Sequence, residues 1–159
     1  NEHSPREVAN LLEEIFSICD TSVKEHDVTR IKTIGDSYMA VAFPDRSTIP
    51  SAVRMARSAL SIVERVSQQL DGIQVRIGLD LGTVIAGVIG KEHLQYDVWG
   101  DTVNTASRME STSLPMMVHI TDAFAQALPD GEFTIESRGT TEVKGKGEMR
   151  THWLHSVDQ

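Results

Sequence analysis

The sequence predicts an α+β sandwich, with helices on one face of an antiparallel-rich sheet. Apolar residues recur at helical spacing in two long segments, 5–24 and 51–70, and strand-like stretches follow each of them. Glycine-containing turns join neighbouring strand stretches, which is typical of hairpins. The order helix, hairpin, helix, hairpin and a mixed tail therefore favours α+β.

The first helix is expected from about Pro5 to Lys24. Ser4 as N-cap, Pro5 in the first turn and Glu7 three residues after the cap form a helix start signal. Cys19 falls on the apolar side of this pattern, so we expect it to be buried. A single cysteine excludes an internal disulfide framework and suits a reducing, cytoplasmic compartment.

The rest of the chain predicts alternating strands and helices. From Thr29 the period changes to two, and a hairpin is expected around Gly35 and Asp36. The stretches 75–82 and 83–90 are expected to pair as a second hairpin near Gly82. The remaining expected elements are a helix at 51–70, a strand at 96–99, a helix at 102–112 with Asp101 as N-cap, strands at 117–121, 133–137 and 150–155, and a short helix at 122–128.

The size and charge of the chain limit its class. Its 159 residues fit one domain, which we expect to span 1–159. The chain lacks the run of about 20 apolar residues that a membrane helix needs, so we expect no membrane contact by this domain, and the sequence leaves open whether a parent protein is anchored. The net charge of -8 argues against nucleic-acid binding.

Polar residues stand out in the stretch IKTIGDSYMA, which begins at residue 31. Lys32 shares a strand face with Ile34, and Asp36 follows Gly35 at the turn. A solvated edge lysine and an ordinary turn aspartate explain these residues equally well when each is taken alone.

A second polar stretch is YDVWGDTVNTASRMEST, which begins at residue 96. Asn104 and Arg108 lie one helical turn apart, where an amide and a guanidinium can grip a ribose and a phosphate oxygen together. A solvent-facing polar stripe is the alternative. Asp97 sits in an otherwise apolar run, an awkward place for an unpaired charge.

A third stretch, VKGKGE, begins at residue 143. Lys144 and Lys146 alternate with glycines, which gives a mobile backbone and two point charges suited to a polyphosphate. A plain surface turn is the alternative reading.

These three stretches, in this order and spacing, resemble the catalytic domains of class III adenylyl and guanylyl cyclases, and the resemblance covers almost the whole chain. It implies a ferredoxin-like α/β sandwich that works as a head-to-tail homodimer with catalytic sites at the interface. The activity it implies is cyclisation of a nucleoside triphosphate, in which the ribose 3′-hydroxyl attacks the α-phosphate in line and pyrophosphate leaves.

The resemblance also implies roles for single residues. Asp36 matches the second of two aspartates that hold two divalent cations, Mg²⁺ or Mn²⁺. Asn104 and Arg108 match the catalytic residues that orient the ribose and stabilise the charge that builds on the α-phosphate. Lys144 matches the lysine that binds the terminal phosphates from the partner side.

The base is expected to be adenine. Lys32 and Asp97 match the pair that recognises the purine, and guanylyl cyclases of the family typically have glutamate and a cysteine or similar small residue there. Lysine can donate to adenine N1, and aspartate can accept from the adenine amine. We therefore expect an adenylyl cyclase that converts ATP to 3′,5′-cyclic AMP; the alternative is an inactive cyclase-homology module that binds nucleotide or regulates a partner.

The match departs from the family pattern in two places. The family's first metal-binding aspartate lies in a strand that would precede Asn1, so a chain that truly begins there is expected to lack the N-terminal strand, bind metal poorly and be inactive. Glu92 stands where some relatives carry a basic residue, a part that Lys91 could take.

Overall fold

The computed structural model describes residues 3–157, and the chain divides into two compact units, Asn1–Ile73 and Gln74–Gln159. The predicted domain boundaries at residues 1 and 159 lie outside the described residues. Both units combine helices with strands that pair mainly antiparallel. The fold is therefore a mixed α+β fold, as the sequence predicts.

The first unit contains two long helices and a hairpin between them in sequence. Ser4 caps the first helix by accepting the backbone N–H of Glu7 at 3.2 Å, as predicted. The hairpin turns at Gly35, whose φ of +58° is a conformation that glycine adopts without steric cost. The elements are α1 (Pro5–Glu25), β1 (Thr29–Ile34), β2 (Ser37–Val41), the 3-10 helix η1 (Pro44–Arg46) and α2 (Ser51–Gln69).

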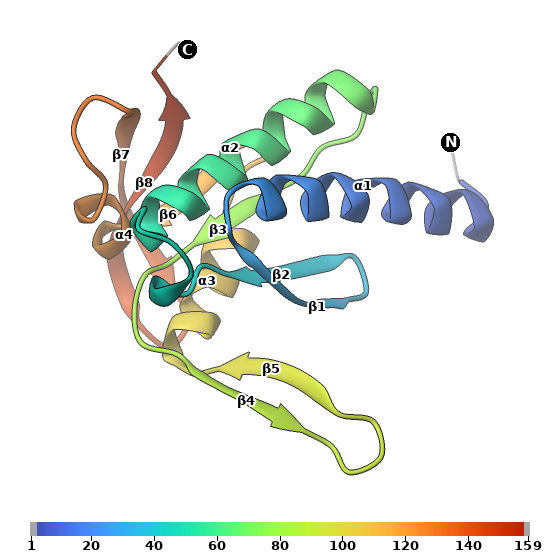
Figure 1. Cartoon of the computed structure of the whole chain (residues 1–159). Coiled ribbons are helices and arrows are strands. Elements are labelled where there is room, and N and C mark those ends of the chain that lie inside the picture. The colour runs from blue at the N-terminus through green and yellow to red at the C-terminus, as the bar shows by residue number, and fades with distance from the viewer. Residues whose placement is uncertain (1–2, 158–159) are drawn as a thin grey trace. The chain divides into compact units, whose positions relative to one another are not determined.

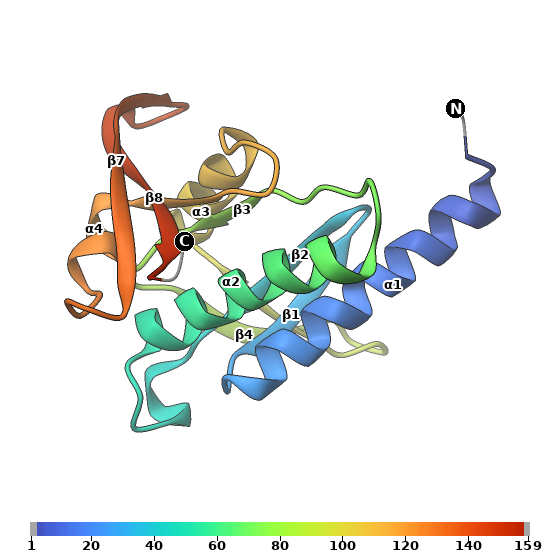
Figure 2. The ribbon, with the colours of Figure 1, turned by 90° about the horizontal axis from the view of Figure 1, so that it is seen from above.

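The core of the first unit forms where α1 packs against α2 and against the β1–β2 hairpin (Figures 1 and 2). Small side chains on α2 allow close packing, because Ala56 and Ala59 are almost completely buried. Cys19 is buried, as predicted, and burial raises the pKa of its thiol to about 11. The thiol therefore stays protonated near neutral pH and acts as a small apolar side chain.

Arg54, at the start of α2, is the largest fully buried side chain of the first unit, with 1 % of its surface exposed. Its Nε donates to the carbonyl of Ile49 at 2.8 Å, and its two terminal nitrogens donate to the carbonyls of Asp27 at 2.7 Å and Phe43 at 2.6 Å. Three loop segments are thereby tied to one guanidinium. The buried charge is tolerated because its donors are satisfied by backbone oxygens.

The second unit contains a four-stranded sheet in the order β3-β6-β8-β7, a separate hairpin and two helices. β3 pairs parallel with β6, whereas β6–β8 and β7–β8 are antiparallel. The elements are β3 (Ile77–Leu79), β4 (Ile85–Ile89), β5 (Gln95–Trp99), α3 (Asp101–Ser111), β6 (Val118–Thr121), α4 (Asp122–Gln126), β7 (Phe133–Val143) and β8 (Gly147–Ser156).

The second hairpin differs from the one predicted at 75–82 and 83–90. β3 takes a partner about forty residues later, β6, and β4 pairs instead with β5, so that Ile85 lies opposite Trp99. The reversal occurs after Gly90, whose φ is +105°. Gly82 suggested a turn from local composition, but the long-range partner of β3 leaves no local signal in the sequence.

The start of α3 also differs from the prediction. Gly100, with a φ of +129°, is the N-cap residue, and it makes no side-chain capping bond. Asp101 is instead the first residue of the helix, where its carboxylate forms an ion pair with Lys146. An acidic side chain in the first turn also interacts favourably with the helix dipole.

Helix α3 lies directly on β3, because Gly78 has no side chain. A Cβ at Gly78 would lie 2.0 Å from the backbone nitrogen of Glu110 and 2.6 Å from the carbonyl oxygen of Ala106. The two backbones therefore touch at this point.

Among the described residues, no helix is both long enough and apolar enough to span a membrane.

Replacing Arg54 by methionine is expected to lower the free energy of unfolding by about 3 kcal/mol or more, because three backbone carbonyls lose the buried donor that ties their segments together. Urea denaturation followed by circular dichroism measures the change. Arg46→Met removes the same charge from an exposed position and should change stability by less than about 0.5 kcal/mol. Equal effects of the two substitutions would contradict this role of Arg54.

Candidate functional site

The β1–β2 hairpin carries the two predicted site residues of the first unit. Lys32 is half-buried in β1 opposite Met39, just after a register irregularity between Arg30 and Lys32. Asp36 is exposed at the turn. The hairpin therefore presents the Asp36 carboxylate at its tip and the lysine on its body.

A polar cluster fixes this hairpin on α1. The Tyr38 hydroxyl donates to Asp20 at 2.7 Å, and Arg30 donates to both oxygens of the same carboxylate at 2.9 and 3.1 Å. Burial, and then the bond to Asp20, raise the pKa of the Tyr38 hydroxyl, so it stays protonated and remains a donor. The ring of Tyr38 also packs near that of Phe16, 5.9 Å between centroids. Helix α1 is thus bonded to both strands of the hairpin, at positions two residues from Lys32 and from Asp36.

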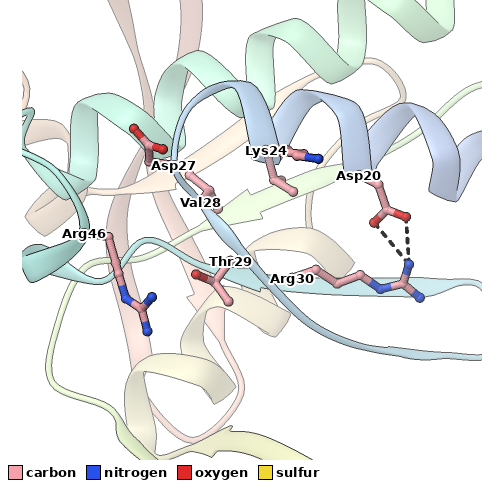
Figure 3. Close-up of a pocket in the computed structure, with 8 residues that line it drawn as sticks. Asp20, Lys24, Asp27, Val28, Thr29, Arg30 and Arg46 are labelled. Atoms are coloured by element: carbon pink, nitrogen blue, oxygen red, sulfur yellow. Dashed lines mark hydrogen bonds and ion pairs between the residues drawn. The ribbon is translucent and has the colours of Figure 1, made fainter.

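An open pocket of about 400 Å³ lies beside this cluster, at the end of α1 (Figure 3). Its charged lining includes Asp20, Lys24, Arg30 and Arg46, and none of the six predicted site residues lines it. Figure 3 shows Arg30 held by Asp20 and Arg46 pointing away from Lys24. Because its cations do not converge, the pocket is a poor match for a triphosphate.

In the second unit, β5 leads directly into α3, and the two elements carry three predicted site residues. Asp97 is half-buried in β5, and its Oδ1 accepts the backbone N–H of Val98 at 2.7 Å, which orients the carboxylate. Asn104 is exposed and Arg108 half-buried on α3, while Thr105 and Met109 face the core. The predicted stripe of Asn104 and Arg108 is therefore on the outer side of the helix.

The fourth predicted site residue of the second unit, Lys144, is exposed in the turn between β7 and β8. The neighbouring Lys146 forms an ion pair with Asp101 in the first turn of α3. This contact brings the lysine turn up to the start of the helix that carries Asn104 and Arg108. The structure thus gathers Asp97, α3 and the lysine turn in one unit, whereas Lys32 and Asp36 belong to the other.

The described residues do not form a complete metal site on their own. Between residues 3 and 157, the structure groups no three His, Cys, Asp or Glu side chains that could hold a metal ion. Asp36 offers a single exposed carboxylate, a ligand type that Mg²⁺ and Mn²⁺ accept. The donor set fits one ligand of such a cation and no more.

Comparison with known proteins identifies the family. The "Adenylate and Guanylate cyclase catalytic domain" family matches residues 1–156 of the chain. The chain belongs to this family. It is therefore a class III nucleotide cyclase catalytic domain, and the resemblance inferred from the three polar stretches is confirmed.

Solved structures and curated relatives support this assignment. The guanylate cyclase domain of RhGC from Catenaria anguillulae in complex with GTP is 36 % identical, with a TM-score of 0.88 over 98 % of this chain and 87 % of that chain. The catalytic core of a rhodopsin-guanylyl cyclase with converted specificity, in complex with ATPαS, is 37 % identical, with a TM-score of 0.87 over 97 % and 85 % of the two chains. Guanylate cyclase 2G of Mus musculus is 41 % identical over 98 % of this chain.

The cyclase domain spans only 15 % of the length of that mouse relative. The comparisons show a nucleotide cyclase domain, but Guanylate cyclase 2G and the RhGC domain are guanylate cyclases, so the adenylyl type does not follow from them.

Two features near the predicted residues were not anticipated from the sequence. Asp20 anchors Tyr38 from 18 positions away, and Lys146 anchors the lysine turn to Asp101 from 45 positions away. Neither pairing leaves a local pattern. The alternation along β2 does mark Tyr38 as a residue two positions from Asp36, which is the signal that could have drawn attention to it.

Tyr38→Phe is expected to lower the free energy of unfolding by about 1 kcal/mol, because the donor to Asp20 is lost. Urea denaturation measures the difference. In an Asp20→Ala background the same substitution should cost almost nothing, since the acceptor is already absent. The same cost in both backgrounds would show that the hydrogen bond contributes no stability.

Proposed function

We propose that this cyclase domain is an adenylyl cyclase that converts ATP to 3′,5′-cyclic AMP and pyrophosphate. The observation that carries the choice of base is the pair Lys32 and Asp97, a donor and an acceptor in a family whose guanylyl members typically have glutamate and a cysteine or similar small residue there. Family membership supports the reaction class, and this pair supports ATP as the substrate.

The pair discriminates between purines through hydrogen bonding. A lysine ammonium can donate to adenine N1, where guanine carries a proton, and a carboxylate can accept from the adenine amine, where guanine has a carbonyl oxygen. Guanine would place a donor, N1–H, opposite the lysine ammonium and an acceptor, the carbonyl oxygen, opposite the carboxylate, so neither side chain could form its hydrogen bond. Unpaired polar groups in a binding site discriminate strongly against the wrong substrate. The bond from Val98 N–H to Asp97 supports this role by fixing the direction of the carboxylate.

The remaining residues act on the sugar and the phosphates. Asn104 orients the ribose so that its 3′-hydroxyl faces the α-phosphate, and Arg108 donates to the phosphate oxygens on which charge develops. Lys144 holds the terminal phosphates and favours departure of pyrophosphate. Their positions on the outer side of α3 and in the lysine turn support this division of labour.

A divalent cation belongs to this proposal. We assign Asp36 as one carboxylate ligand for Mg²⁺ or Mn²⁺, with the other aspartate expected before Asn1. Such cations, when bound, lower the pKa of the attacking hydroxyl and neutralise the triphosphate. The cytoplasmic location expected from the single cysteine stays a prediction.

GTP is the second candidate substrate, because relatives about 40 % identical are guanylate cyclases. Yet the rhodopsin-guanylyl cyclase core with converted specificity binds an ATP analogue, and it is similar to this chain over nearly its full length. Similarity to a guanylate cyclase therefore does not decide which purine nucleotide a member of this family uses.

The second copy in the predicted head-to-tail homodimer has a candidate contact surface. The β4–β5 hairpin extends away from the four-stranded sheet of its unit (Figure 1) and exposes large apolar side chains on both strands. Isolated two-stranded hairpins are marginally stable in water, and exposed apolar patches mark interaction sites. The most exposed large apolar side chains of the hairpin are Ile85 at 57 % and Val88 at 60 % in β4 and Leu94 at 72 % in the connecting loop. We assign this hairpin to the dimer interface.

A chain extended before Asn1 is expected to form cyclic AMP from ATP and Mn²⁺, and Arg108→Ala is expected to lower kcat by about 100- to 1,000-fold, the usual loss for a donor to developing charge. Product formation followed by liquid chromatography measures both. Asp36→Ala should also abolish activity, and Arg46→Ala should not affect it. An extended chain that binds nucleotide but forms no product would favour the inactive cyclase-homology module.

Lys32→Glu combined with Asp97→Cys is expected to shift the preference toward GTP, because the donor and acceptor pattern is reversed. The ratio of kcat/KM for ATP to that for GTP should fall by about 100-fold or more. Lys24→Ala, which changes the net charge by the same −1 at an exposed position, should leave the ratio unchanged. An active double variant with the original ATP:GTP ratio would refute the assignment of the pair.

A further inference from the structure

The last turn of α3 is held by side chains that come from the sheet. The backbone carbonyls of a final helical turn have no partner within the helix. Here the carbonyl of Met109 accepts from Nδ1 of His119 in β6 at 2.9 Å, and the carbonyl of Thr112 accepts from Arg138 in β7. Two residues of the same sheet, on the strands that flank β8, therefore cap one helix end.

His119 is fixed in one tautomer by its surroundings. A carbonyl oxygen can only accept, so Nδ1 carries the proton toward Met109. Nε2 then accepts from the Thr151 hydroxyl at 2.8 Å and lies 3.3 Å from Arg138. The side chain is completely buried, and burial, together with the Arg138 charge, lowers the pKa of His119. The imidazole is therefore neutral and used at both nitrogens.

Trp153 in β8 holds the two capping side chains together. Its ring lies 4.9 Å from that of His119, and the Arg138 guanidinium lies over it at 4.5 Å. Stacking of this kind is attractive and restricts the orientation of the guanidinium. We call His119, Arg138 and Trp153 the α3 clamp.

The clamp acts next to Arg108. The capped carbonyl belongs to the following residue, Met109, and the carbonyl of Arg108 itself accepts the Thr112 hydroxyl at 2.6 Å, which in turn lies 3.3 Å from His119 Nδ1. The backbone of β3 at Gly78 lies directly against the backbone of Met109 and Glu110 in this last turn. A shift of α3 along or about its axis would therefore disturb these contacts as well as the position of Arg108.

We infer that His119 is a positioning residue for catalysis: through the last turn of α3 it sets the place of the Arg108 guanidinium at the reacting phosphate. This inference rests on the proposed role of Arg108. Arginine is useful at a transition state only in the correct place, and displacement by about 1 Å can cost on the order of 100-fold in rate. A displaced Arg108 should lower kcat more than it changes KM, because Arg108 acts on charge that develops during the reaction.

The test compares histidine variants in the extended chain with ATP and Mn²⁺, at a temperature well below the unfolding transition of each variant. His119→Ala should lower kcat by about 10- to 100-fold with KM for ATP changed less than about 3-fold. His119→Asn, whose amide can donate at the position of Nδ1, should recover most of kcat, whereas His119→Gln, which mimics Nε2, should not.

His152→Gln is the matched control. His152 also lies in this sheet and is hydrogen-bonded, to Asp122 at 2.8 Å, but that contact holds α4 and not α3. It should keep kcat within about 2-fold of the original.

A double variant separates positioning from general stability. If His119 acts through Arg108, His119→Ala should lower kcat no further in an Arg108→Ala background. Full additivity of the two losses, or a His119→Ala variant with normal kcat while Arg108→Ala is impaired, would overturn the inference alone. Normal kcat in Arg108→Ala itself would overturn the proposed function instead.

Discussion

The direct backbone contact between β3 and α3 at Gly78 is the constraint on which the second unit depends. A helix that touches a strand this closely cannot move away from the sheet without losing the contact. A single methyl group at Gly78 would lie 2.0 Å from the backbone nitrogen of Glu110. With the core side fixed in this way, the opposite side of α3 is free to carry polar residues. Asn104 and Arg108 occupy that side at the one-turn spacing that the helix imposes.

The two ends of α3 are tied to different parts of the same sheet. The first turn is paired with the lysine turn through Asp101 and Lys146, and the last turn is capped by His119 and Arg138. These contacts differ in strength. An ion pair with one partner 73 % exposed contributes little to stability, whereas the capped carbonyls sit beside a histidine with no exposed surface. The buried end should therefore be the rigid one, and the end facing the lysine turn the adjustable one.

Local chemistry explains which parts of the fold the sequence predicts well. The Ser4 cap, the Gly35 turn and the periodicity of α1 and α2 are each encoded within a few residues, and all are present in the structure. The pairing of β3 with β6 was missed because its partner is about forty residues away. Asp101 was assigned as an N-cap because its ion pair with a distant lysine is invisible in the sequence.

The site residues follow the same rule. Asn104 and Arg108 form a pattern on one helix, so spacing alone suggested a shared role, and the structure keeps them on one side of α3. The supporting residues leave no such pattern. His119 lies on a strand on which all four residues are buried, so composition suggests only core, and its bonds to Met109 and Thr151 come from elements 10 and 32 residues away. Motifs thus indicate the chemistry, whereas the geometry that supports it emerges only from the fold.

The preference that we propose for this cyclase domain is for adenine. It is tested most directly by giving the extended, unmodified chain ATP and GTP in equal concentration with Mn²⁺ and measuring the two cyclic products together, since their ratio reports the ratio of kcat/KM values. Recognition of adenine by Lys32 and Asp97 predicts an excess of cyclic AMP over cyclic GMP of more than about 100-fold. An excess of cyclic GMP would contradict it and assign the domain to the guanylyl cyclases.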